Sequence, residues 1–406
     1  MARAAAISKR TGFILRVCLA AAIFAFGIAI ANPGLLRRAI FGLALFALPL
    51  LCQFVKWPLV RAYALWFGVF LVIQSLMTPI LVGDAADFIT LTPNQTITEN
   101  LKDGTLPGIA GPQRITTDAH GFRVFPPVYY EHKSGLRIFA IGGSTTEEIS
   151  LDDQATWTHG VQVALAHELG KPVEVINTGV SGLMARHHLA TLKHILPLHP
   201  DLVLILVGAN DWNFEIRRQF GTDVPPKRLT FTDTPLARLV QAAYFQVSRA
   251  SRTVQVEPTH ENSLLRERKI PWFPKEIADE YRATLRKISD TCRQNKLTCM
   301  FLTQPNAYKN EAPQELRDRF WMTPPAASYT LTFDSLIRVA DVYNRGLIDF
   351  ATERGHPICD VAPKIPPTGE YFFDEFHYTS NGSAELAKAV ADCLKPLLGG
   401  AKTTSR

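Results

Sequence analysis

The chain has 406 residues, a formal net charge of +6 and 47% hydrophobic residues, enough for one large domain with additions or for two domains. Much of the positive excess lies beside apolar stretches near the N-terminus, and the rest of the chain has no dense basic run with interleaved aromatic residues. This distribution argues against nucleic-acid binding and favours an association with a membrane.

Residues 1–82 are predicted to form a membrane region with three transmembrane helices. Apolar segments at 13–31, 39–55 and 62–82 approach the roughly 20 residues that a spanning helix needs. The second segment is the shortest and contains Pro49, so it is the weakest of the three candidates.

Positive charges set the expected orientation of these segments. Five of them should stay in the cytoplasm, before the first segment and between the second and the third: Arg3, Lys9, Arg10, Lys56 and Arg61. Three spans then place the rest of the chain outside the cytoplasm, whereas it would stay inside if the second segment did not span. Arg37 and Arg38 count against this arrangement. We expect an anchor in a bacterial inner membrane, with the C-terminal domain on the extracytoplasmic side.

The sequence AIAN at 29–32 offers an alternative for the first segment, because it resembles a signal-peptidase site. Cleavage after Ala31 would leave two spans and the same final location. An uncleaved anchor is favoured, because the segments that follow are also apolar enough to be embedded.

Residues 83–135 are predicted to be a connector packed on the main domain, with short strands. They have little periodicity and are rich in Thr, Pro and Gly. Within them, DAHGFRVFPP at 118–127 indicates an ordered turn, because a glycine between polar and aromatic residues is typical of a specific bend.

From residue 136 short apolar stretches alternate with helical patterns. The expected strands are 136–142, 173–179, 201–210, 298–305 and 357–361. The expected helices are 154–169, 182–199, 275–296, 332–354 and 381–396. This alternation predicts an α/β fold with a parallel sheet covered on both faces. Such sheets bind ligands at the carboxyl ends of their strands, so the residues that follow each strand are the candidates for a site.

Ser144 follows the first of these strands, in the stretch IFAIGGSTTEE at 138–148. The glycines before it permit a tight turn, and the N-terminus of a following helix would direct N–H groups at the site. By itself this serine fits a helix cap as well as a nucleophile. A phosphate-binding loop is disfavoured, because neither GxxxxGK[ST] nor GxGxxG occurs here.

Asp374 and His377 supply what a serine nucleophile needs. They lie three residues apart just before the last predicted helix. Histidine accepts the proton of the hydroxyl near neutral pH, and a carboxylate on its second nitrogen fixes the tautomer and stabilises the imidazolium. Gly179 and Asn210 follow two other strands and offer a backbone N–H and a side-chain amide to a developing oxyanion.

Taken together, four sequence blocks resemble the SGNH hydrolases, the GDSL esterase/lipase superfamily. They are GGST with Ser144, NTGVSG with Gly179, VGAND with Asn210, and DEFH with Asp374 and His377. The resemblance covers about residues 136–398. It implies a flavodoxin-like three-layer α/β/α fold and ester hydrolysis without a metal or cofactor.

The resemblance also implies roles for the individual residues. Ser144 would be the nucleophile, His377 the base and Asp374 its orienting carboxylate. The N–H groups of Ser144 and Gly179, with the Asn210 side chain, would form the oxyanion hole. Gly143 departs from the family pattern, which usually has aspartate before the serine.

A second departure from the family is an insertion at 212–274, which leaves the sheet at the edge that carries the site. We expect a helix around 235–252 and a wall or lid over the pocket; a peripheral decoration is the alternative. Residues 399–406 form a tail.

Other polar groups have simpler interpretations. His187 and His194 share a helix face but have no evident metal-binding partners, so surface or core positions are favoured. Glu147 and Glu148 suit the first turn of a helix. Asp211 would hydrogen-bond beneath Asn210.

The sequence alone does not decide whether the cysteines form disulfides. Four lie in the soluble part, in no pattern that matches a zinc site or a CxxC pair: Cys292, Cys299, Cys359 and Cys393. They allow three disulfide pairings in an oxidising compartment, and they would otherwise be free buried thiols.

These observations predict a membrane-anchored serine esterase that hydrolyses acyl esters, including O-acetyl esters, of a cell-envelope glycan or lipid. The expected partners are an acyl-ester substrate and a membrane. One alternative is an acyltransferase that resolves the same acyl-enzyme with a sugar hydroxyl. Another is a catalytically silent component that binds or assembles the envelope.

Overall fold

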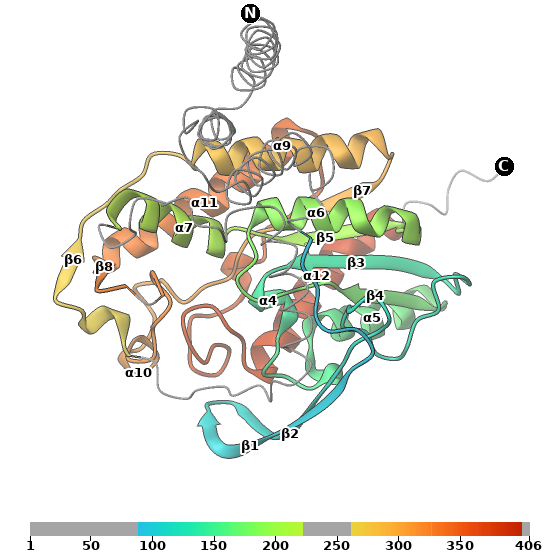
Figure 1. Cartoon of the computed structure of the whole chain (residues 1–406), viewed down its shortest axis with the longest axis horizontal. Helices are drawn as coiled ribbons and strands as arrows, with labels where there is room; N and C mark the ends of the chain where they lie inside the picture. The colour runs from blue at the N-terminus through green and yellow to red at the C-terminus, as the bar shows by residue number, and fades with distance from the viewer. Residues whose placement is uncertain (1–87, 222–260, 326, 400–406) are drawn as a thin grey trace, which may run out of the picture. The chain divides into compact units, whose positions relative to one another are not determined.

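The computed structural model of the chain describes residues 88–221, 261–325 and 327–399 (Figure 1). The predicted membrane region, the AIAN sequence, the helix expected around 235–252 and the tail after residue 399 lie outside these residues. Among the helices that are described, none combines the length and apolarity needed to cross a membrane.

A five-stranded parallel sheet forms the centre of the described structure. Its strands are β3 (Leu136–Gly142), β4 (Val173–Asn177), β5 (Leu202–Leu206), β7 (Thr298–Leu302) and β9 (Ile358–Cys359). They lie in the order β4-β3-β5-β7-β9 and all neighbours pair in parallel. Nearly every residue of these strands is buried, as expected for a sheet covered on both faces. The predicted α/β fold with a parallel sheet is confirmed, and its strand order is that of flavodoxin-like folds.

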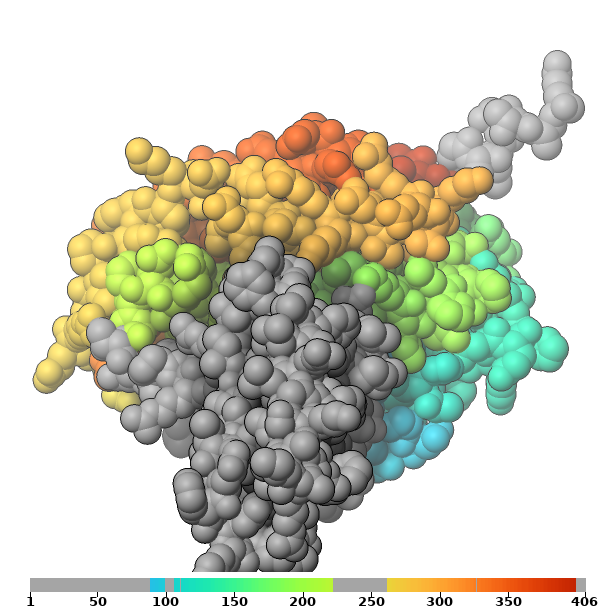
Figure 2. Space-filling view, turned by 45° about the horizontal axis from the view of Figure 1, so that its top comes forward, coloured from blue at the N-terminus to red at the C-terminus, as the bar shows by residue number. Residues whose placement is uncertain are grey.

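Helices cover both faces of this sheet. The longer ones are α5 (Trp157–Leu169), α6 (Ala185–Ile195), α9 (Asp279–Gln294), α11 (Phe333–Glu353) and α12 (Ser380–Gly399). α5 packs on α12, and α6 packs on α9. Right-handed crossovers put α6, α9 and α11 on the face opposite α5. Figure 2 shows the gold and orange residues of α9 and α11 above the green residues of α6 and α7 on one surface.

The predicted insertion at 212–274 begins differently from the expectation. The strand expected at 201–210 ends at Leu206, and Asn210 lies in the first turn of α7 (Ala209–Phe220). Near the other end of the insertion, β6 (Arg268–Ile270) pairs in parallel with β8 (Tyr329–Leu331). Residues 222–260, which the lid expectation concerns, lie outside the described residues.

The connector contains longer strands than the sequence suggested. β1 (Thr96–Leu106) and β2 (Ile109–Thr116) form an antiparallel hairpin, seen in blue in Figure 1. The N–H groups of Arg114 and Thr116 donate to carboxylates of the main domain, Asp152 (2.9 Å) and Asp153 (3.1 Å). Residues 88–135 belong to the same compact unit as the sheet.

Gly121 explains the ordered turn expected at 118–127. Its φ of +74° is left-handed, and a Cβ there would meet the carbonyl oxygen of Leu91 at 2.1 Å. Only glycine fits such a position, because other residues add both strain and a clash. The predicted turn is confirmed.

Two disulfides settle the alternatives that the sequence left open. Cys292 of α9 pairs with Cys299 of β7, and Cys359 of β9 pairs with Cys393 of α12. Each bridge therefore ties a strand of the sheet to a helix on one of its faces. The alternative of four free thiols does not apply.

Candidate active site

Ser144 lies at the carboxyl end of β3, where the sheet opens. It is the first residue of α4 (Ser144–Glu147), a single helical turn. Gly143 precedes it, and a Cβ at that position would meet the Asn210 Nδ2 atom at 2.8 Å. A side chain before Ser144 would therefore lie against the amide of Asn210.

A continuous chain of hydrogen bonds joins Ser144, His377 and Asp374. The Ser144 Oγ atom lies 2.8 Å from His377 Nε2, and His377 Nδ1 lies 2.7 Å from Asp374 Oδ2. These residues come from two ends of the domain, 233 positions apart. The structure thus brings together the three side chains whose chemistry suits nucleophilic attack by a hydroxyl.

The electrostatics of this chain favour an ionised Asp374. Burial raises the pKa of its carboxyl, but His377 and two backbone N–H groups outweigh burial, and the pKa lies below the ordinary value. Those N–H groups belong to Phe376 and His377 and donate to Oδ1 at 2.8 Å. The indole N–H of Trp321 donates to Oδ2 at 3.1 Å. For His377, burial lowers the pKa and Asp374 raises it, with a net upward shift.

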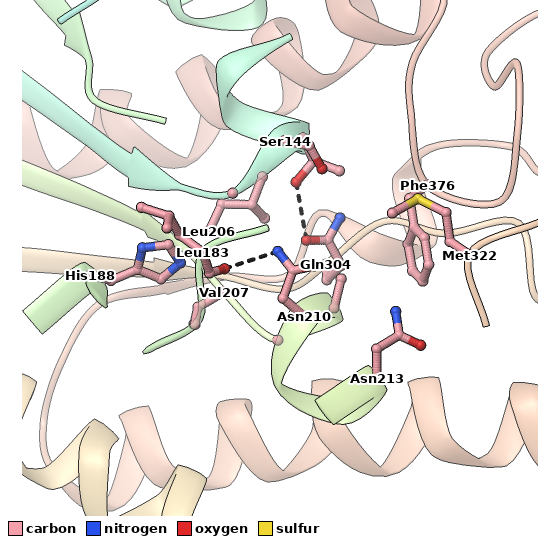
Figure 3. A pocket seen from close by; sticks show the side chains of 14 residues that line it. Ser144, Leu183, His188, Leu206, Val207, Asn210, Asn213, Gln304, Met322 and Phe376 are labelled. Carbon is pink, nitrogen blue, oxygen red and sulfur yellow. Dashed lines mark hydrogen bonds between the residues drawn. The ribbon is translucent and has the colours of Figure 1, made fainter. Parts of the chain in front are cut away.

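The amide of Asn210 lies beside Gly143, the residue that precedes Ser144. Its Nδ2 atom donates to the carbonyl of Leu183 at 2.9 Å, a bond drawn in Figure 3. A primary amide carries two N–H groups, so one remains for a ligand. Because Nδ2 also lies against Gly143, that second N–H is close to the atoms that surround Ser144.

Gly179 does not have the free N–H that the sequence suggested. Its N–H donates to Asn177 Oδ1 at 2.9 Å, and a Cβ on it would meet the α4 backbone at 2.3 Å. This contradicts its predicted role as an oxyanion donor. The N–H of Gly182, three residues further on, has no acceptor among the described residues. Gly182 adjoins Leu183, whose carbonyl holds the Asn210 amide.

A small pocket opens beside Ser144 (Figure 3). Its cavity volume is about 10 Å³, room for about one water-sized sphere. Two of its polar atoms are buried without a hydrogen-bond partner among the described residues: Nδ1 of His188 and Oδ1 of Asn213. Burial lowers the pKa of His188 to about 3, so its ring is neutral near pH 7. The pocket is therefore narrow and partly polar.

Glu147 lies in the single turn of α4, as expected, whereas Glu148 is the residue that ends it, which corrects the expectation for that residue. Glu147 is the last residue of α4, and its carboxylate accepts from the N–H and the hydroxyl of Ser181. Glu148 has a left-handed φ of 51° and is buried. Burial raises its pKa to about 8. A helix of one turn also contributes little dipole at its N-terminus.

Other candidates have structural partners. His187 Nδ1 accepts the N–H of Met184 at 2.9 Å, at the start of α6. His194 stacks on Phe88, with ring centroids 3.8 Å apart. Asp211 accepts the N–H of Ala185 at 3.1 Å, so it supports the neighbouring helix and not Asn210 itself.

The sequence did not single out several residues that surround the site. Trp321 and Asn213 carried no signal, because neither lies in a motif. Gln304 was placed at a strand end, and its Oε1 accepts the Thr145 hydroxyl at 3.3 Å. Arg123 lay unremarked in the predicted turn at 118–127, although its side chain reaches the end of α4.

Known proteins support the family assignment. The model of the GDSL-like lipase/acylhydrolase family matches residues 140–384, more than half of the 406-residue chain. The chain belongs to this family. The family-level resemblance predicted from the four sequence blocks is confirmed, and this GDSL-family chain is an ester-hydrolysing enzyme.

Solved structures similar to the GDSL-family chain share little sequence with it. A catalytic mutant of Axe2, an acetylxylan esterase from Geobacillus stearothermophilus, has 17% identity and a TM-score of 0.38, covering 64% of this chain and 94% of that one. LAE5, an α/β hydrolase enzyme from the metagenome of Lake Arreo, has 15% identity and a TM-score of 0.39, covering 66% and 99%. No curated protein matches the chain.

Proposed function

We propose that the chain is a serine esterase in which Ser144 is the nucleophile, His377 the general base and Asp374 its orienting carboxylate. The observation that carries this proposal is the unbroken chain of hydrogen bonds from the Ser144 hydroxyl through His377 to Asp374, at 2.8 and 2.7 Å. A hydroxyl in this position loses its proton to the imidazole as it attacks.

The reaction proceeds in two steps. Ser144 Oγ attacks the acyl carbon while its proton passes to His377 Nε2, and the alcohol then leaves with that proton. Water repeats the sequence on the acyl-enzyme and restores the serine. Asn210 and the N–H groups of Ser144 and Gly182 stabilise the oxyanion in both steps. Gly182 takes the place that Gly179 cannot fill, because the Gly179 N–H is already bonded to Asn177.

The pocket favours a short acyl group such as acetyl. Its cavity volume of about 10 Å³ is room for about one water-sized sphere, which suits a small acyl group better than a long hydrocarbon chain. The pocket also holds two buried polar atoms without a partner among the described residues, Oδ1 of Asn213 and Nδ1 of His188, and such atoms suit a small polar group better than a hydrocarbon chain. We therefore propose O-acetyl esters of an envelope glycan or lipid as the substrate class.

We also propose that the N-terminal region anchors the enzyme in a membrane, with the catalytic domain on the extracytoplasmic side. The two disulfides support this placement, because such bonds persist in oxidising compartments. A C-terminal alkaline phosphatase fusion tests it. An active fusion is expected, and an inactive but stably expressed one would refute the placement.

The decisive experiment compares p-nitrophenyl acetate with longer p-nitrophenyl esters, using the full-length chain and Ser144→Ala. Hydrolysis of the acetate that disappears in Ser144→Ala is expected. Hydrolysis that persists in the variant would overturn the nucleophile assignment. Adding sugar acceptors to the same assay separates hydrolysis from acyl transfer, since transfer yields an acylated sugar.

A further inference from the structure

Every carbonyl of α4, the turn that carries Ser144, is taken by a partner. A helix leaves its last carbonyls without intrahelical donors, so nearly all the carbonyls of a one-turn helix need donors from elsewhere. Only the first of these partners is local, since it belongs to the residue that directly follows the turn: Ser144 O accepts from Glu148 N, Thr145 O from Trp157 Nε1, Thr146 O from Asn177 Nδ2 and Glu147 O from Arg123 Nη1. The position of the serine therefore depends on side chains from distant segments.

Arg123 makes the largest share of these contacts. Its guanidinium donates to the carbonyls of Glu147 (2.8 Å), Glu148 (2.7 Å) and Leu151. Its Nε atom pairs with Asp153 at 2.9 Å. The arginine is only 3% exposed, so these bonds are made away from water, where an unpaired partner is costly.

The backbone of Arg123 fixes the direction from which this side chain arrives. Its N–H donates to Asn177 O at 2.9 Å, and its carbonyl accepts from Asn177 N at 3.0 Å. Asn177 is the last residue of β4 and donates its own side-chain amide to Thr146 O. The connector thus reaches the nucleophile turn along the edge of the sheet, and Arg123 and Asn177 hold the turn together.

We propose that Arg123 is a positioning residue for the nucleophile: its planar fork fixes the end of α4 and thereby sets the geometry between Ser144 and His377. This inference rests on the proposed function. Lysine cannot replace the fork, because a single ammonium group cannot hold three carbonyls and a carboxylate at once. Loss of the fork lets the turn shift, and a displacement of about 1 Å can cost about 100-fold in rate.

Arg137, on the strand that leads to Ser144, offers a matched control. It lies near the start of β3, at the end opposite Ser144, and is 0% exposed. Its Nε pairs with Glu174 at 2.7 Å, and its Nη1 donates to Leu198 O at 2.9 Å. Arg123→Lys and Arg137→Lys therefore remove similar buried forks, but only the first touches the nucleophile turn.

The test measures kcat, KM and Tm for p-nitrophenyl acetate hydrolysis by the full-length wild type and both variants. We expect both substitutions to lower Tm. Arg123→Lys should also lower kcat by about 10- to 100-fold with little change in KM, whereas Arg137→Lys should keep the wild-type kcat. Equal kcat values in the two folded variants would overturn the inference.

Two further measurements cover the remaining outcomes. If Arg123→Lys does not fold, Asp153→Asn loosens the same fork while Arg123 stays, and an unchanged kcat in that variant would overturn the inference. If the wild type shows no Ser144-dependent turnover, the proposed function fails. Crystal structures of wild type and Arg123→Lys then decide: a displaced Ser144 supports positioning, and an unchanged distance to His377 contradicts it.

Discussion

Replacing Asp374 by asparagine should change both the rate and the pH dependence of ester hydrolysis. The carboxylate accepts four hydrogen bonds, two at each oxygen, including those from His377 Nδ1 and Trp321 Nε1 at Oδ2. An asparagine must direct its NH₂ group at one of these pairs of donors. If the NH₂ faces His377, the ring is held in the tautomer whose Nε2 carries the proton and cannot accept one from Ser144.

The expected size of the effect follows from this loss. Misorienting the base of such a triad lowers kcat by about 10⁴-fold, which corresponds to about 5.5 kcal/mol in the activation free energy. The pH profile should move as well. Burial lowers the pKa of His377 and Asp374 raises it above its usual 6.5, so the variant should have a lower His377 pKa. Its remaining activity should then persist to lower pH.

The assay is kcat/KM for p-nitrophenyl acetate from about pH 4 to about pH 9, with wild type and Ser144→Ala measured in parallel. A fall of less than about 10-fold in Asp374→Asn would refute the orienting role. An acidic limb that stays at the wild-type pH would refute the electrostatic part of the reasoning.

Three further variants test separate parts of the structure. Asn210→Ala removes an oxyanion donor and should lower kcat by about 10²- to 10³-fold with little change in KM; a rise in KM alone would contradict that role. Burial raises the pKa of Glu148 from 4.5 to about 8, so the folded state keeps a proton that the unfolded state has lost, and stability falls as pH rises between these values. Urea unfolding of Glu148→Gln should show that fall reduced by about 1.4 kcal/mol per pH unit; identical slopes would contradict it. Replacing Cys359 and Cys393 by serine opens a loop with a sequence separation of 34 and should cost roughly 4 kcal/mol in the free energy of unfolding; unchanged stability under oxidising conditions would contradict the bond.

The parallel sheet could be predicted because its strands are short, apolar on both faces and separated by helical patterns. That prediction also located the site, since polar residues follow the strands at one edge. Ser144, Asn210, Asp374 and His377 were named from such positions, and the structure brings them together.

The choice of Gly179 shows where sequence reasoning stops. NTGVSG contains two glycines, and composition does not reveal which N–H is free. The side chain of Asn177 folds back on Gly179, while Gly182 adopts a left-handed φ of +80° in the next turn. Only the backbone geometry distinguishes them.

Long-range contacts were also beyond the sequence. Arg123 lies 24 residues before the carbonyl of Glu147 that it binds, and no periodicity links the two positions. The cysteine pairing likewise depends on which helix covers which strand. The one-turn length of α4 follows from the left-handed conformation at Glu148. The sequence STTEE does not reveal that conformation, because acidic residues are also typical of the first turn of a longer helix.

The most direct test of the central claim is mass spectrometry of the full-length protein during turnover of p-nitrophenyl acetate, followed by peptide mapping. The proposed mechanism predicts an acetyl group on the peptide that contains Ser144, and none in Ser144→Ala. Acetylation of a different residue, or hydrolysis by Ser144→Ala at the wild-type rate, would contradict it.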